Sequence, residues 1–162
     1  MDTVTSDKGT NRKHALLVVE DNPSMRLLFK HLLQVAYEVE AVSGIDEALH
    51  RAEQQVFDGL VLDIQLGEDR TGVDLLHILR ARPAYREVPA LACTAYAQSG
   101  DDFLKQGFDA FLGKPFSREA LYAVLERIIG YHEQPCGNVA LGQIIRQKPR
   151  IPAFFARILA FR

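Results

Sequence analysis

Cysteine is scarce in this chain, and tryptophan is absent. The two cysteines, Cys93 and Cys136, form neither a C-x-x-C pair nor a Cys/His zinc spacing, so neither a disulfide framework nor a structural zinc site is expected. No apolar run approaches the roughly 20 residues of a membrane span, and the polar residues 1–13 contain no signal-peptide core. These absences predict a cytoplasmic protein.

A strong net charge is also lacking, since the formal charge is −2 at pH 7. Global attraction to nucleic acid is therefore not expected. The charge is nevertheless uneven, because residues 1–130 carry 14 Lys and Arg against 20 Asp and Glu, whereas residues 131–162 carry five against one. We interpret the chain as a polar extension (1–13), one domain (14–130) and a basic, partly amphipathic extension (131–162).

Within residues 14–130, short runs rich in β-branched residues alternate with longer segments of helical periodicity. This alternation is typical of βαβ units, in which right-handed crossovers build a parallel sheet covered by helices. We therefore predict an α/β fold, a doubly wound five-stranded parallel sheet with helices on both faces. The predicted strands are 15–19, 37–42, 59–64, 88–94 and 109–112.

Capping residues predict where the intervening helices begin and end. Asn and Ser accept hydrogen bonds from the first helical N–H groups, and Gly ends helices because it adopts left-handed conformations. The predicted N-caps are Asn22, Ser43, Ser99 and Ser117, and the predicted ends include Gly107 and Gly130.

Polar residues stand at the predicted ends of the strands. Glu20-Asp21 follows the first strand, Asp63 lies in the third, Thr94 ends the fourth, and Lys114 follows the fifth. Because parallel strands present their carboxyl ends at one edge of the sheet, these side chains are expected to converge. Carboxylates brought together either repel one another or hold a cation, and an all-oxygen set suits Mg2+. A lysine and a hydroxyl beside them indicate phosphoryl transfer to aspartate.

This set of residues resembles the signature of bacterial response-regulator receiver domains, the CheY-like proteins of two-component signalling, and the resemblance covers residues 14–130. The resemblance implies the flavodoxin-like form of the doubly wound fold. It also implies that Asp63 is the phosphoacceptor and that Glu20, Asp21, Asp63 and the backbone carbonyl of Gln65 hold Mg2+. Taken singly, Asp63 could also be an ordinary loop cap.

The same resemblance assigns the remaining site residues. Thr94 would supply the switch hydroxyl, Phe111 the switch aromatic, and Lys114 the phosphate partner before a cis proline. An aromatic residue in a strand also suits the core, so a purely structural role for Phe111 stays open. One departure concerns the loop after the acceptor, where Gly72 lies nine residues beyond Asp63 rather than the family's eight. We therefore expect a longer, differently shaped loop.

Two forms of receiver, and an enzyme as a function of a different class, are the candidates for this set of residues. The first is a stand-alone receiver that accepts a phosphoryl group from a sensor histidine kinase or a histidine phosphotransfer protein and signals to another protein. A receiver module from a larger hybrid kinase or effector is the alternative. A phosphatase of the haloacid-dehalogenase type would want a second acid where Gln65 stands, so turnover of an external substrate is not expected.

The C-terminal extension carries a separate prediction. Pro152 can open a helix whose apolar stripe includes Phe154, Phe155 and Leu159. A helix this short is only marginally stable in water unless its apolar stripe packs on another surface. We therefore predict that 139–162 docks on the acidic domain or on a second copy of it. A membrane surface and disorder are the alternatives.

Overall fold

Five strands form one parallel sheet in the order β2-β1-β3-β4-β5. The computed structural model describes residues 12–67, 69–95 and 100–133. Its strands are β1 (Ala15–Val19), β2 (Glu38–Val42), β3 (Gly59–Asp63), β4 (Ala90–Thr94) and β5 (Ala110–Gly113). The predicted α/β fold with a doubly wound parallel sheet is confirmed.

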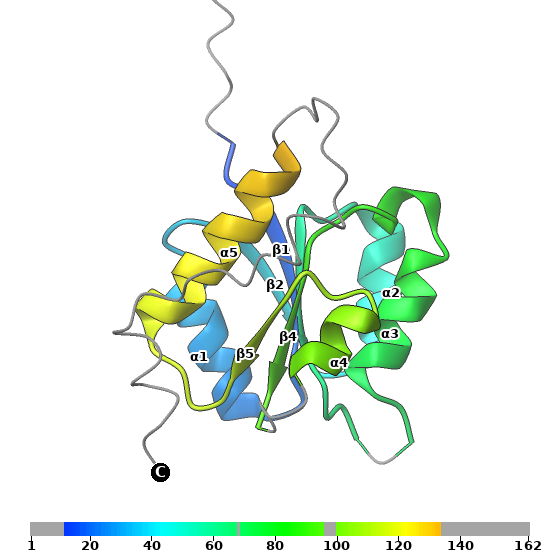
Figure 1. Ribbon diagram of the computed structural model, residues 1–162, viewed down its shortest axis with the longest axis horizontal. Helices are drawn as coiled ribbons and strands as arrows, with labels where there is room; N and C mark the ends of the chain where they lie inside the picture. The colour runs from blue at the N-terminus through cyan, green and yellow to red at the C-terminus, as the bar shows by residue number, and fades with distance from the viewer. Residues whose placement is uncertain (1–11, 68, 96–99, 134–162) are drawn as a thin grey trace, which may run out of the picture.

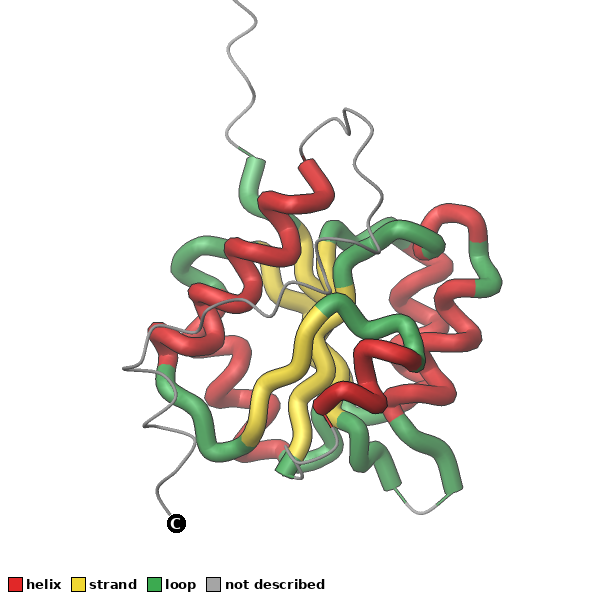
Figure 2. The backbone as a smooth tube through the Cα atoms, in the orientation of Figure 1, coloured by secondary structure: helices red, strands yellow, loops and turns green. Residues whose placement is uncertain are grey.

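Helices cover both faces of the sheet, as Figure 1 shows. One side carries α1 and α5, and the other carries α2, α3 and α4, so the strands form the middle of three layers (Figure 2). The helices are α1 (Pro23–Leu33), α2 (Ile45–Gln54), α3 (Gly72–Arg80), α4 (Gly100–Lys105) and α5 (Arg118–Glu133), with a short 3-10 turn, η1 (Pro83–Tyr85).

The alternation of side chains along β1 divides the core into two clusters. Ala15, Leu17 and Val19 join the cluster beneath α2 and α3, whereas Leu16 and Val18 join the cluster beneath α1 and α5. Successive side chains of a strand point to opposite faces, so a strand buried on both sides must be apolar throughout. All five residues of β1 are buried.

The first helix begins as its sequence predicts. Asn22 Oδ1 accepts hydrogen bonds from the N–H groups of Ser24 (3.0 Å) and Met25 (3.1 Å), and Pro23 occupies the first helical position. These bonds satisfy two of the N–H groups that have no partner within the helix. The start of α1 is therefore fixed by two residues of the turn itself, Asn22 and Pro23.

Two predicted helix boundaries are wrong. At α2, Gly44 is the N-cap without a side-chain cap, and the Glu47 carboxylate instead accepts from the N–H and hydroxyl of Ser43. Helix α5 continues through Gly130 to Glu133. A glycine inside a helix costs only about 1 kcal/mol, and the preceding turn is held by the buried Ile128 and Ile129.

The loop between β3 and α3 contains a positive-φ glycine and a short bridge. Gly67 adopts a φ of +119°, and Gln65 forms an isolated antiparallel bridge with Thr71. A capping box then starts α3, because Thr71 and Asp74 each accept a hydrogen bond from the other's N–H. The two ends of the loop are therefore fixed beside Asp63.

Two of the predictions fall on segments that the structure does not describe. The Ser99 cap and the amphipathic segment 139–162 lie outside the described residues. Within the described ranges, no helix is both long and apolar enough to cross a bilayer.

Candidate functional site

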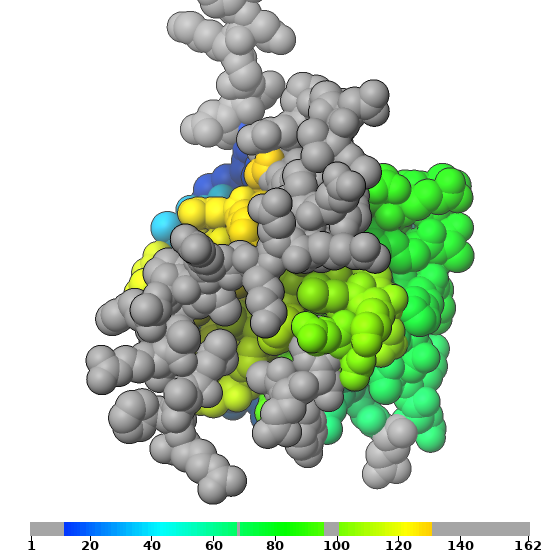
Figure 3. Space-filling model, viewed as in Figure 1, coloured from blue at the N-terminus to red at the C-terminus, as the bar shows by residue number. Residues whose placement is uncertain are grey.

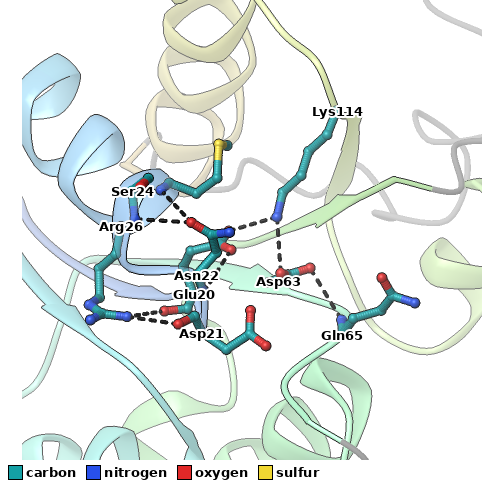
Figure 4. A network of polar contacts seen from close by, with 9 residues as sticks. Glu20, Asp21, Asn22, Ser24, Arg26, Asp63, Gln65 and Lys114 are labelled. Carbon is teal, nitrogen blue, oxygen red and sulfur yellow. Dashed lines mark hydrogen bonds and ion pairs between the residues drawn. The ribbon is translucent and has the colours of Figure 1, made fainter.

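The ends of four strands bring the predicted site residues to one edge of the sheet. Glu20 and Asp21 follow β1, and Asp63 is the last residue of β3. One carboxylate oxygen from each of these three acids lies within 4.8 Å of the others. Lys114, which follows β5, reaches the same point (Figure 4).

Lys114 joins two of the three acids. Its Nζ lies 2.6 Å from Glu20 Oε2 and 2.9 Å from Asp63 Oδ2. Glu20 is 1% exposed and Asp63 6%, so both ion pairs are shielded from water, whereas Asp21 is exposed. Charge-assisted hydrogen bonds in such a place are short and strong, and they fix the position of the lysine between the carboxylates.

Burial and charge act in opposite directions on these groups. Burial raises the pKa of Glu20, and the hydrogen bond from Lys114 offsets only part of that effect. For Lys114, burial alone would lower the pKa, but the bonds to Glu20 and Asp63 outweigh it, so the pKa is raised. The ammonium therefore keeps its proton at neutral pH.

The acidic cluster has the composition of a magnesium site. Mg2+ binds oxygen ligands at about 2.0–2.1 Å in octahedral geometry, so opposite ligands are about 4.2 Å apart. The three carboxylate oxygens are separated by up to 4.8 Å, which small side-chain movements would close to that geometry. The donor set fits Mg2+, and Glu20, Asp21 and Asp63 are the residues that could hold it.

The remaining predicted site residues lie close by in the fold. Thr94 is buried at the end of β4, and its carbonyl accepts the Lys114 N–H at 2.7 Å. The Lys114–Pro115 peptide bond is cis, as the resemblance implies. Gln65 donates its N–H to Asp63 Oδ1 at 3.2 Å, and Phe111 is partly buried against the core beneath α2 and α3. The switch roles of Thr94 and Phe111 and the ligand role of the Gln65 carbonyl stay predictions.

Sequence reasoning did not single out the steric role of Gly72. A Cβ atom at this position would lie 2.1 Å from the carbonyl oxygen of Asp63. Real Cβ contacts are never that short, so only glycine lets α3 begin this close to the acceptor. The spacing of Gly72 from Asp63 signals a family pattern, but the contact that requires it appears only in three dimensions.

The chain belongs to the response regulator receiver domain family, whose model matches residues 16–126. Among curated proteins, it is 31% identical over 120 residues to the polar-differentiation response regulator DivK of Brucella ovis, covering 72% of this chain and 96% of that protein. It is 32% identical over 115 residues to the signal transduction histidine-protein kinase BarA of Shigella flexneri. That match covers 69% of this chain but only 12% of the kinase.

Solved structures show the same fold. The receiver domain of the sensor histidine kinase PA1611 from Pseudomonas aeruginosa PAO1 is 34% identical with a TM-score of 0.66, over 73% of this chain and 98% of that one. That structure has a magnesium ion coordinated in its active site cleft. The chemotaxis response regulator CheY4 of Vibrio cholerae is 29% identical with a TM-score of 0.66, over 72% and 98%.

Proposed function

We propose that this receiver accepts a phosphoryl group on Asp63 from a phosphohistidine of a sensor histidine kinase or a histidine phosphotransfer protein. A carboxylate oxygen of Asp63 forms the new bond to phosphorus while the bond to the donor histidine nitrogen breaks, and histidine leaves with the electron pair. The observation that carries this proposal is the placement of Asp63, which lies at a strand end between Lys114 and two further carboxylates.

The residues around Asp63 have different roles in the proposed transfer. Glu20, Asp21, Asp63 and the carbonyl of Gln65 would hold Mg2+, and the bound ion would supply positive charge for the oxygens of the transferred group. Lys114 neutralises Asp63 before transfer and the phosphoryl group afterwards. The Thr94 hydroxyl can donate a hydrogen bond to a phosphoryl oxygen.

The experiment that tests this function is labelling with a small phosphodonor. In the presence of Mg2+, acetyl phosphate should label the wild-type chain, and Asp63→Asn should abolish the label because the amide is not a nucleophile of comparable strength. Asp69→Asn is the matched control, since Asp69 is an exposed aspartate on the loop beside the site. Undiminished labelling of Asp63→Asn would overturn the assignment.

The output of the phosphorylated form is a change in protein contacts and not turnover of an outside substrate. Gln65 stands where a phosphatase of the haloacid-dehalogenase type has its second acid, so the chain lacks the general acid that repeated turnover needs. A magnesium-dependent label that stays on the chain, with no more than about one phosphate released per chain, would support the signalling role. Many turnovers of acetyl phosphate per chain would favour the enzyme.

The relatives leave two forms of this function. The matching region covers 96% of DivK but only 12% of the kinase BarA. A stand-alone regulator is the form that we predict, with a module of a hybrid kinase as the alternative. The apparent mass of the native protein on an immunoblot distinguishes them.

A further inference from the structure

A second positively charged side chain, that of Arg26, contacts the acidic pair Glu20-Asp21 from the side opposite Lys114. Arg26, in the first turns of α1, donates from Nη1 to the carbonyl oxygen of Glu20 (2.8 Å) and to that of Asp21 (3.1 Å). Figure 4 shows the guanidinium on one side of the turn and the carboxylates of Asp21 and Asp63 on the other. The contact is therefore with the backbone of the turn and not with the acidic side chains.

The two acids are held in different ways. Glu20 is buried, and its side chain is fixed by Lys114 and by a 3.4 Å bond from the Asn22 N–H. Asp21 is exposed, and within the described part of the chain its carboxylate has no hydrogen bond of its own. The position of the Asp21 carboxylate consequently depends on the backbone of the turn, which the hydrogen bonds from Arg26 hold against α1.

The charge of Arg26 could act in two directions on a bound cation. If its positive charge were felt at the metal site, Arg26 would weaken cation binding through repulsion. Its charge is directed at two carbonyl dipoles on the far side of the turn, however, and its Nη1 atom donates to both carbonyl oxygens. The orienting effect is therefore expected to exceed the repulsion.

We infer that Arg26 is a positioning residue that sets the affinity of the acidic pair for Mg2+ by holding the Glu20-Asp21 backbone against α1. This inference rests on the proposed function, because it concerns the same metal site. Residues that orient metal ligands typically change metal affinity 10-fold to 100-fold when they are replaced. Arg26 carries no signal in the sequence that separates it from an ordinary helix-surface arginine, since its partners are main-chain atoms.

The test is a titration of the phosphate-free protein with MgCl2, followed through the backbone amide NMR signals of Asp21, Asp63 and Gln65. Arg26→Met should weaken Mg2+ binding about 10-fold or more. Arg26→Lys should fall between Arg26→Met and the wild type, because lysine keeps the positive charge and the donors but its shorter side chain cannot place them where Nη1 lies. Labelling by acetyl phosphate at saturating Mg2+ should reach the wild-type extent in both variants.

Arg51→Met is the matched control, because Arg51 is a partly buried helix arginine that contacts Glu40 of β2 and not the site. It should leave Mg2+ affinity unchanged. Thermal melting in EDTA shows whether each variant is folded, and Arg26→Lys carries the test if Arg26→Met is not. Unchanged or tighter Mg2+ binding by the folded Arg26 variants would overturn the inference.

The outcomes also separate this inference from the proposed function. Wild-type protein that binds Mg2+ and is labelled on Asp63, together with equally tight binding by Arg26→Met, refutes the role of Arg26 alone. Wild-type protein that binds no Mg2+ and takes no label refutes both. A lower Mg2+ affinity in Arg26→Met with wild-type labelling at saturation supports both.

Discussion

Among single residues, Gly72 places the tightest steric limit on Asp63. An added Cβ would meet the Asp63 carbonyl oxygen at 2.1 Å, and a backbone atom cannot rotate away as a side chain can. We predict that Gly72→Ala lowers the free energy of unfolding by about 2 kcal/mol or more. It should also shift the amide signal of Asp63 and reduce labelling by acetyl phosphate.

The matched control for this prediction is Gly44→Ala. Nothing lies within 4 Å of a Cβ at Gly44, and its φ of −161° is ordinary extended backbone. Because Gly44 is the N-cap of α2 and alanine is a poorer cap than glycine, chemical denaturation should show a cost of about 1 kcal/mol or less, smaller than that of Gly72→Ala. Equal effects of the two substitutions would mean that the close approach at Gly72 does not constrain the acceptor.

The site residues at strand ends were predictable because the topology of a parallel sheet alone places them at one edge. Once parallel strands are recognised, the residues after each strand must meet, so Glu20, Asp63 and Lys114 could be grouped from the sequence. Arg26 could not, since bonds to main-chain carbonyls leave no mark in residue type. Residue type also does not show which apolar side chains of α1 are buried: Leu28 is 42% exposed, whereas Phe29 and Leu33 are buried.

At the scale of an element, α3 depends on its capping box. The backbone N–H of Thr71 donates to the Asp74 carboxylate, and this bond, assisted by the Thr71 hydroxyl, lowers the pKa of Asp74. A depressed folded-state pKa adds stability that is present above the unfolded value of 3.8 and is lost as pH falls through the lower folded value. We predict that Asp74→Asn lowers Tm at pH 7 and that the difference from wild type narrows below about pH 3.8.

Thermal melts of wild type and variant between pH 7 and pH 3 check this dependence. Thr71→Ala should cost about 1 kcal/mol, the usual effect of losing an N-cap. Glu87→Gln is a suitable control, because Glu87 is an exposed acid in the loop before β4. A deficit in Asp74→Asn that stayed constant over the whole range would show that the ionised carboxylate is not the stabilising partner.

Helices α4 and α5 are the elements expected to respond to phosphorylation. They lie on opposite sides of the edge strand β5, which carries Phe111, and the space-filling view shows parts of both helices on the side of the molecule that faces the viewer (Figure 3). If Thr94 and Phe111 act as a switch, beryllofluoride with Mg2+ should shift a pre-existing equilibrium. We predict changed amide hydrogen exchange in α4 and at the start of α5, whereas β1 should be unaffected.

The switch prediction has an internal control in Thr94→Ala, which removes the hydroxyl but leaves the acceptor. Exchange in α4 should then become insensitive to beryllofluoride, although the analogue still binds. Identical exchange with and without the analogue in the wild type would exclude the switch.

Element boundaries were less predictable than the elements themselves. Gly130 looked like a helix end because glycine often adopts left-handed conformations there, but α5 extends past it to Glu133. At α2, Gly44 and not the predicted Ser43 is the N-cap, and the Glu47 carboxylate accepts a hydrogen bond from the Ser43 N–H. In both places small local preferences of about 1 kcal/mol compete, so residue type alone does not decide the outcome.

At the scale of the whole molecule, the basic C-terminal extension (131–162) is predicted to dock on the acidic domain or on a second copy of it. Residues 1–130 and 131–162 carry opposite net charge, and the helix that Pro152 is predicted to open would have an apolar stripe that needs a surface to cover it. We predict that a chain truncated after Glu133 melts at a lower temperature than the full chain or differs from it in oligomeric state. Differential scanning calorimetry and light scattering at low and high salt measure both.

The control for truncation is a full-length chain in which Arg150, Arg157 and Arg162 are replaced by Gln. It retains the apolar stripe but loses charge, so it should resemble the truncated form most closely at low ionic strength if attraction to the acidic domain matters. Identical melting and mass in all three proteins would show that the extension does not dock.

The contact between Lys114 and Glu20 joins residues 94 positions apart in sequence. During synthesis, β1 and β3 leave the ribosome long before the lysine that neutralises their acids. A nascent chain that ends before Lys114 therefore has the acceptor aspartate but an unbalanced cluster of negative charge around it. If Asp63 accepts a phosphoryl group as proposed, a chain without Lys114 would lack a cation that the transfer needs, so only chains that include the last strand would draw on the phosphodonor.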